Sequence, residues 1–250
     1  MSTTATTSTS AECQTRSSSE LLVWLRSDPM AARKAQAEIY KRHPLIWLLG
    51  ADRIPQQVFT QDEHDPDVVA KPFPDKAYLR EMVRLWLGGK MNLWEKSRQM
   101  MASWLMCAMY LHDTQYISQG GGRRLNFIQS KKEEDSDALL KRCYFIYENQ
   151  EPWLKTLYPA EYSYCHLKFF RPDDAERKLP AGELWAIPQG GDVLRQHTAS
   201  GLFIDEGGFQ PDLAASIRAA QPMLKGGGRV DVVSSANPGY FELLCEGRLK

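Results

Sequence analysis

The sequence has no long run of apolar residues and no excess of either charge. Its longest apolar run, from Trp104 to Leu111, is far shorter than the roughly 20 residues that a membrane-spanning helix needs. The 31 Lys and Arg residues balance the 31 Asp and Glu residues. We therefore expect neither an integral membrane protein nor a generally basic protein that coats nucleic acid, although a local basic patch is compatible with this balance.

Cysteine and histidine are scarce and scattered. The five cysteines contain no CxxC pair, and the five histidines are scattered along the chain. Neither a disulfide framework nor a structural zinc site is therefore expected. The adjacent Cys165 and His166 cannot alone supply four tetrahedral ligands. We expect reduced thiols, as in a cytosolic protein.

The rest of the composition is that of a globular protein. Of the 250 residues, 43% are hydrophobic and 25% are charged, which is enough to build a sizeable core. Among the first 19 residues, however, 12 are Ser or Thr. This segment has too few apolar side chains to offset the entropy that ordering would cost. We therefore expect residues 1–19 to be a disordered tail, and the segment lacks the apolar core of a signal peptide. Residues 20–74 are expected to form a helical and irregular N-terminal region, and residues 75–250 the main domain.

The first part of the chain is predicted to be helical, and after Gly88 and Gly89 short apolar runs alternate with helical segments. Helices are predicted at residues 21–25, 31–40, 75–87, 103–112 and 133–147. Strands are predicted at residues 91–94, 125–129, 164–170, 184–188, 202–205 and 230–234, with 164–170 and 184–188 as a candidate hairpin. Strands separated by helices indicate an α/β fold with a mainly parallel sheet and helices on both faces. The helix at 75–87 is expected to bury Tyr78, Met82, Leu85 and Trp86.

The first polar segment that follows a predicted strand is Lys96-Ser97-Arg98-Gln99-Met100-Met101-Ala102-Ser103. It leads into an apolar helix, where backbone N–H groups and a helix N-terminus can hold a phosphate. The standard motif GxxxxGK[ST] is not matched, because Lys96 and Met101 replace its glycines and Ala102 its lysine. Only the terminal hydroxyl of Ser103, the Mg²⁺ ligand of that motif, is kept. Alone, the segment is more typical of an ordinary strand-to-helix loop.

Two further strands end in polar residues. The strand Gly201-Leu202-Phe203-Ile204 ends in Asp205 and Glu206, which suits phosphoryl transfer because one carboxylate can hold Mg²⁺ while the next polarises a water. An acidic turn before Gly207-Gly208 is the alternative. The strand at 230–234 is followed by Ser235, Ala236 and Asn237, at the edge where open α/β sheets bind ligands. An Asn-Pro-Gly turn is the alternative there.

The order and spacing of these three segments resemble the ATPase domain of the large terminase subunit of tailed bacteriophages, the motor that packages DNA into capsids. The resemblance covers residues 46–250. In many family members the loop lysine stands at the start of the loop, as in Lys96-Ser97-Arg98-Gln99. A flexible ammonium can reach the phosphates from either end of the loop. Met101 and Ala102 depart from the family pattern.

The resemblance implies a P-loop NTPase fold of the ASCE type that hydrolyses ATP with Mg²⁺. It assigns the nucleotide to residues Lys96 to Ser103, Mg²⁺ to Ser103 and Asp205, and catalysis to Glu206. No residue matches the family's adenine-contacting glutamine.

Two further roles come from the resemblance. Ser235, Ala236 and Asn237 match a coupling motif that relays the state of the γ-phosphate to the parts that grip DNA. Arg195 stands where some relatives place an arginine finger that acts on a neighbouring subunit, and such a residue can stabilise the transition state strongly. An exposed arginine at a strand edge is an equally weighted alternative for Arg195.

The implied partners are double-stranded DNA, a portal protein, a small terminase subunit and further copies of the chain in a ring. The implied location is the bacterial host cytoplasm, with transient docking on the procapsid. DNA would be held through its phosphates, with Arg123, Arg124, Lys131 and Lys132 as candidate contacts, although such residues are more often simply solvated.

Large terminases carry a second, RNase H-like nuclease domain. This chain stops 13 residues after Asn237, so we expect an ATPase core that is incomplete at its C-terminus and no nuclease domain. Two alternative functions remain. One is another P-loop DNA-dependent ATPase, such as a helicase. The other is a truncated or non-catalytic terminase remnant that binds nucleotide, DNA or a partner subunit.

Overall fold

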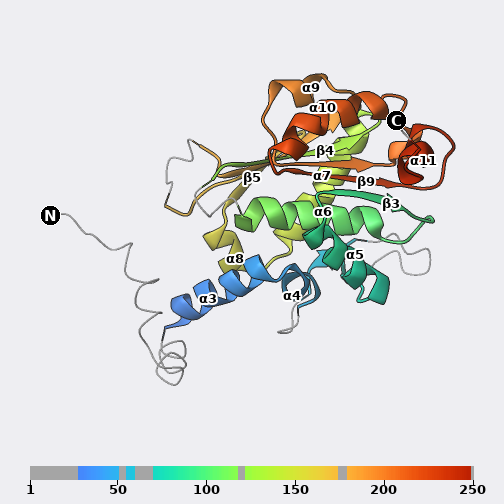
Figure 1. Cartoon of the computed structure of the whole chain (residues 1–250). Coiled ribbons are helices and arrows are strands. Elements are labelled where there is room, and N and C mark those ends of the chain that lie inside the picture. Colours follow the sequence, from blue (N-terminus) through green and yellow to red (C-terminus); the bar gives the residue numbers. More distant parts are fainter. Residues whose placement is uncertain (1–27, 51–54, 60–69, 118–121, 174–178, 249–250) are drawn as a thin grey trace. The chain divides into compact units, whose positions relative to one another are not determined.

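The computed structural model describes residues 28–50, 55–59, 70–117, 122–173 and 179–248 (Figure 1). The chain divides into two compact units, residues 1–43 and 44–250. The described part of the first unit is helix α3 (Pro29–Arg42), which the Asp28 side chain caps by accepting two backbone N–H groups of the first turn. Proline suits the first helical position because no hydrogen bond is lost there. The helix predicted at residues 31–40 is thus confirmed, whereas the predicted tail and the helix at 21–25 lie outside the described residues.

The second unit is built on a seven-stranded sheet in the order β3-β9-β8-β4-β7-β6-β5. All neighbours from β3 to β7 are parallel, and β6 and β5 add an antiparallel hairpin at one edge. The mainly parallel sheet predicted from the sequence is therefore confirmed. Its strands are β3 (Met91–Glu95), β4 (Arg124–Ser130), β5 (Ala160–Ser163), β6 (His166–Phe169), β7 (Gly182–Pro188), β8 (Gly201–Asp205) and β9 (Arg229–Ser234).

Helices cover both faces of this sheet (Figure 1). On one face, α9 (Asp192–Gln196) and α10 (Leu213–Lys225) lie over β8 and β9, with Leu213 and Ile217 of α10 packed against Ile204 and Val232. The opposite face carries α6 (Ala102–His112), α7 (Glu133–Glu148), α4 (Pro44–Leu49) and α5 (Ala77–Gly88). Helix α6 is buried on every side, as its apolar sequence requires. Among the described residues, no helix combines the length and apolarity needed to cross a membrane.

Shorter elements complete the unit. They are the strands β1 (Gln57–Val58) and β2 (Lys71–Pro72), the π-helical turn η1 (Asp113–Ile117), the 3₁₀ turn η3 (Gly207–Phe209), and the helices α8 (Pro152–Leu157) and α11 (Tyr240–Cys245). Strands β1 and β2 pair antiparallel, so the region before residue 75 contains a small sheet that the sequence did not predict. The glycines at 226–228 form the turn between α10 and β9.

The buried face of α5 differs from the prediction. Leu79, Val83 and Trp86 face the core, whereas Tyr78 and Leu85 are 38% and 43% exposed. The indole of Trp86 donates a hydrogen bond of 3.0 Å to Asp231 in β9. This bond, together with the spacing of Leu79, Val83 and Trp86 at i, i+4 and i+7, fixes which side of the helix faces the sheet.

The candidate hairpin is correct in direction but incomplete. Strand β6 pairs antiparallel with β7, as expected, and also with β5, which the sequence did not predict. The turn between β5 and β6 contains Cys165 with a φ of 59°.

The order of the strands determines where the polar segments meet. Strand β9 lies between β3 and β8, and all three run parallel. The loop after β3, the acidic pair at the end of β8 and the polar residues after β9 therefore emerge side by side at one edge of the sheet.

Candidate functional site

The loop between β3 and α6 is hydrogen-bonded to the end of the neighbouring strand β9. The backbone N–H of Lys96 donates to the carbonyl of Ser234 in β9, at 3.0 Å. Gln99 and Met101 have left-handed φ angles of 63° and 55°. Met101 occupies the N-cap of α6, and no side chain caps the first turn. The free N–H groups of that turn suit an anion.

Asp205 and Ser103 are brought together at the ends of β8 and the loop. The Ser103 hydroxyl donates to Asp205 Oδ1 at 2.7 Å, and Asp205 is only 9% exposed. Burial raises the pKa of Asp205 above its usual value, the hydrogen bond from Ser103 opposes this shift, and the neighbouring Glu206 charge adds to it. A carboxylate and a hydroxyl are oxygen donors of the kind that Mg²⁺ prefers.

These two side chains fit Mg²⁺ only if other ligands complete its shell. Among the described residues, no group of three or more His, Cys, Asp or Glu side chains is placed to hold a metal ion. Mg²⁺ commonly takes one or two protein oxygens together with phosphate and water. The pair formed by Ser103 and Asp205 therefore matches a metal that arrives with a phosphorylated ligand.

Glu206 joins the three polar segments. The Lys96 ammonium donates to Glu206 Oε1 at 2.6 Å, and the backbone N–H of Ser235 donates to Oε2 at 3.1 Å. Burial works to raise the pKa of Glu206, but these two donors and the positive charges of Lys96 and Arg98 hold it below its usual value. Glu206 is therefore a carboxylate at neutral pH, with one oxygen on the loop lysine and one on the segment after β9.

The segment after β9 is hydrogen-bonded to the turn after Glu206. The N–H of Gly208 donates to Ser234 Oγ at 2.9 Å, and Asn237 Nδ2 donates to the Gly208 carbonyl at 2.6 Å. A Cβ at Gly208 would lie 2.8 Å from Ser234 Oγ, so glycine is needed at this close approach. Glu206 is therefore bonded directly to Ser235, and Asn237 is bonded to Gly208, two residues after Glu206.

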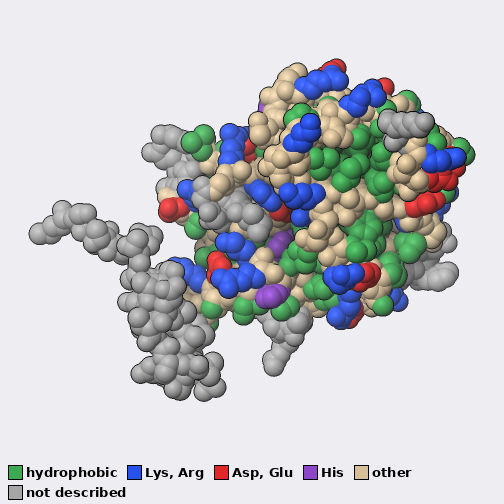
Figure 2. All heavy atoms as spheres, in the orientation of Figure 1, with side chains coloured by type: hydrophobic (Ala, Val, Ile, Leu, Met, Phe, Trp, Pro, Cys, Tyr) green, Lys and Arg blue, Asp and Glu red, His purple; other side chains and the backbone are tan. Residues whose placement is uncertain are grey.

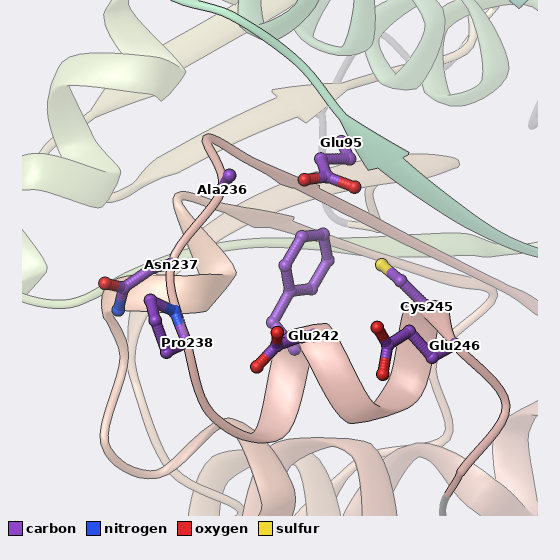
Figure 3. Close-up of a pocket in the computed structure, with 8 residues that line it drawn as sticks. Glu95, Ala236, Asn237, Pro238, Glu242, Cys245 and Glu246 are labelled. Carbon is purple, nitrogen blue, oxygen red and sulfur yellow. The ribbon is translucent and has the colours of Figure 1, made fainter.

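Beside this segment lies a pocket of about 270 Å³ (Figure 3). It is lined by the end of β3, the turn after β9 and helix α11. Ala236 and Asn237 both line it. The other lining residues are Glu95, Pro238, Phe241, Glu242, Cys245 and Glu246. The predicted coupling residues thus lie between the Glu206 carboxylate and a pocket rich in acidic side chains.

Arg195 is not brought to this cluster. It lies on helix α9, rather than at a strand edge, and its guanidinium donates to Asp192 at 2.8 Å. Its side chain is 59% exposed. In the part of the chain that the structure describes, no hydrogen bond or ion pair joins it to the other predicted site residues. Arg195 is thus an exposed arginine that pairs with Asp192 on its own helix.

Several residues at the site escaped the sequence analysis. The Tyr78 hydroxyl donates to the carbonyl of Met100 in the loop, at 3.3 Å. Gln210 Nε2 donates to the Asp205 carbonyl at 2.7 Å, and Gln129 at the end of β4 in turn donates to Gln210 Oε1 at 2.8 Å. The position of Gln129, a polar residue directly after the buried Phe127 and Ile128 of β4, is the one local signal of this support in the sequence.

Comparison with known proteins shows the fold. No family model and no curated protein sequence matches this chain. Its structure is similar to the large terminase ATPase domain of Thermus phage P74-26, with a TM-score of 0.51, 13% identity and 68% of each chain covered. It is also similar to the large terminase of a thermophilic bacteriophage, with a TM-score of 0.50 and 11% identity, covering 70% of this chain and 44% of that one. These similarities confirm the predicted fold class, an α/β P-loop NTPase fold.

Proposed function

We propose that this chain is the ATP-hydrolysing part of a large terminase, a motor that packages viral double-stranded DNA into capsids. The observation that supports this most directly is the convergence of Lys96, Ser103, Asp205 and Glu206 at one sheet edge, in a fold shared with terminase ATPase domains. Lys96 and Ser103 come from one segment and Asp205 and Glu206 from another, more than 100 residues further along the chain. They supply a cation, two metal ligands and a base.

Lys96 takes the role of the usual loop lysine from an unusual position. The standard position holds Ala102, which is buried and uncharged. The Lys96 side chain is only 12% exposed, and its ammonium already reaches the end of β8. An ammonium held there can meet the β- and γ-phosphates of ATP, while the uncapped first turn of α6 donates backbone N–H groups.

Ser103 and Asp205 would hold Mg²⁺ through their side-chain oxygens. When bound, the ion neutralises the charge that develops on the phosphates. The hydroxyl of Ser103 now donates to Asp205 and keeps both oxygens on the same side of the site.

Glu206 orients and activates the attacking water. Its lowered pKa keeps it ionised, so it can accept a hydrogen bond from the water and draw off its proton. A γ-phosphate that binds Lys96 frees Glu206 Oε1 for this role. Because Oε2 is bound by Ser235, a change at Glu206 is passed to Ser235, Ala236 and Asn237. Arg195 would act on the site of a neighbouring copy as the arginine finger.

The DNA would be held through its phosphates in a ring of copies, together with a portal protein and a small terminase subunit, in the host cytoplasm and at the procapsid. On the face shown in Figure 2, Lys and Arg side chains lie in small groups among acidic ones. This distribution supports local contacts with DNA and not a continuous basic face.

Phosphate release, measured with and without double-stranded DNA, tests the proposal. The natural chain should hydrolyse ATP, and Lys96→Ala and Glu206→Ala should each lower the rate by about 100-fold or more. Lys225→Ala, at the exposed end of α10, is the matched control and should leave the rate unchanged. Equal rates in all four chains would contradict an ATPase role. Nucleotide binding without any turnover would favour the non-catalytic alternative.

A further inference from the structure

Arg142 on helix α7 lies next to the start of α6. Its guanidinium carbon is 5.4 Å from the centre of the Trp104 ring, and Trp104 directly follows Ser103 in the sequence. Helices α6 and α7 pack against each other, with Cys107 Sγ donating to the carbonyl of Leu139. Arg142 therefore contacts the beginning of α6 from α7.

No residue that the structure describes uses the donors of Arg142. The other half-buried arginines in the described chain are both hydrogen-bonded: Arg124 to Asp113 through two bonds of 2.8 Å, and Arg229 to the carbonyl of Trp86 at 2.9 Å. Arg142 makes no hydrogen bond or ion pair to any described residue. Its guanidinium makes a cation–π contact with the face of Trp104. A guanidinium with five unused donors, half removed from water, suits an incoming anion.

The charge of Arg142 acts on the same carboxylate as Lys96. Burial raises the pKa of Asp205, and the positive charge of Arg142 opposes that shift more strongly than the charge of Lys96 does. Arg142 is therefore one of the cations whose charge reaches Asp205.

The loop itself leaves a place for such a cation. Ala102, only 2% exposed, stands where a P-loop usually has its lysine, and Lys96 takes that role from the start of the loop, so the first turn of α6 carries no cation of its own. An arginine from a neighbouring helix can supply one, because its planar fork donates two parallel hydrogen bonds to phosphate oxygens.

We propose that Arg142 is a phosphate-binding residue, whose guanidinium donates to oxygens of the terminal phosphates of a nucleoside triphosphate beside Asp205. The inference rests on the proposed function, since it concerns the same nucleotide site. It adds a contact from α7, the helix that follows β4, to a site otherwise built from the ends of β3, β8 and β9.

The test compares three variants of the full chain. Arg142→Gln removes the charge but keeps an unbranched stem against Trp104, and Arg142→Lys keeps the charge without the fork. Lys141→Gln is the matched control, because this neighbouring lysine is 61% exposed and pairs with Asp137 at 2.9 Å. Isothermal titration calorimetry with magnesium-bound ATPγS and ADP gives the affinities without turnover, and thermal unfolding without nucleotide reports on folding.

Arg142→Gln should weaken ATPγS binding by about tenfold or more, because hydrogen bonds to a charged group are lost. ADP binding should weaken less, so the preference for the triphosphate falls. Arg142→Lys should recover part of the loss, and Lys141→Gln should bind like the natural chain.

An unchanged affinity for ATPγS in Arg142→Gln overturns the inference. So does an equal loss for both nucleotides together with a lower melting temperature, because Arg142 would then be a packing residue. In both cases the natural chain still binds nucleotide and the proposed function stands. If the natural chain binds neither nucleotide, the proposed function fails and the inference with it.

Discussion

The ammonium of Lys96 lies 2.6 Å from Glu206 Oε1, so the cation proposed for the phosphates and the carboxylate proposed for the water neutralise each other. The pair is partly shielded from water, with side-chain exposures of 12% and 40%. In the proposed mechanism, a γ-phosphate would compete with Glu206 for the ammonium of Lys96. Separation of the pair would also free the oxygen of Glu206 that a water would need. We therefore propose that this contact couples nucleotide binding to the activation of the base.

Substituting Glu206 should affect binding and turnover in opposite directions. Glu206→Gln removes the negative partner of Lys96, so ATPγS should bind about fivefold more tightly, a gain of roughly 1 kcal/mol. Hydrolysis should fall by at least about 100-fold, because the base is lost. Titration calorimetry and single-turnover phosphate release measure the two effects. Glu242→Gln, in the neighbouring pocket, is the control, and an unchanged ATPγS affinity in Glu206→Gln would show that the ion pair does not resist binding.

The left-handed conformation of Met101 should make glycine favourable at this position. Met101 has a φ of 55°, which costs a side-chain-bearing residue about 1–2 kcal/mol. Met101→Gly should therefore stabilise the fold by about 0.5 to 1 kcal/mol after the entropy of the unfolded chain is counted. Met100→Gly is the matched control, since Met100 is not among the described residues with a positive φ, and it should destabilise the fold. Urea unfolding measures both, and equal effects would refute the role of the backbone.

The sequence predicts those parts of the fold that repeat simple patterns. The apolar runs of β8 and β9, with polar residues directly after them, are enough to indicate buried parallel strands and a ligand edge. The loop at Lys96 and the pair Asp205 and Glu206 stand out for the same reason, because each lies at a strand end.

Other features depend on contacts between distant segments. The inward face of α5 is set by the bond from Trp86 to Asp231, 145 residues away. Ser234 can accept a hydrogen bond from the N–H of Gly208 only because β9 lies next to β8. Arg142 looks like any charged residue of an amphipathic helix until α7 is placed against α6. None of these relationships has a local signal in the sequence.

Asp231 should be important for stability although it lies away from the proposed chemistry. This fully buried carboxylate accepts hydrogen bonds from four side chains of α5, β3 and α6. The donors are Trp86 at 3.0 Å, Asn92 at 2.8 Å, Trp94 at 3.2 Å and Tyr110 at 2.9 Å. Asp231→Leu should lower the free energy of unfolding by about 3 to 5 kcal/mol, because buried donors would lose their acceptor.

Urea unfolding checks this value against an exposed aspartate. Asp192 is 91% exposed and forms one ion pair with Arg195, so Asp192→Leu should change the unfolding free energy by no more than about 0.5 kcal/mol. Similar losses of unfolding free energy in the two variants would mean that the hydrogen bonds to Asp231 are not what holds β3 and α5 against β9.

Glu183 should make the fold sensitive to acid. Burial works to raise its pKa, but hydrogen bonds from His166 and Arg123 outweigh burial and lower the pKa to about 2. Because the folded pKa lies below the ordinary value of 4.5, ionised Glu183 stabilises the fold fully above that value. The contribution is lost as the pH falls from 4.5 toward 2.

Urea unfolding at a series of pH values should show this loss, and the unfolding free energy of Glu183→Gln should depend less steeply on pH over the same window. Glu134→Gln, at the exposed start of α7, is the control that should keep the slope of the natural chain. The same slope in Glu183→Gln as in the natural chain would assign the acid sensitivity to other carboxylates.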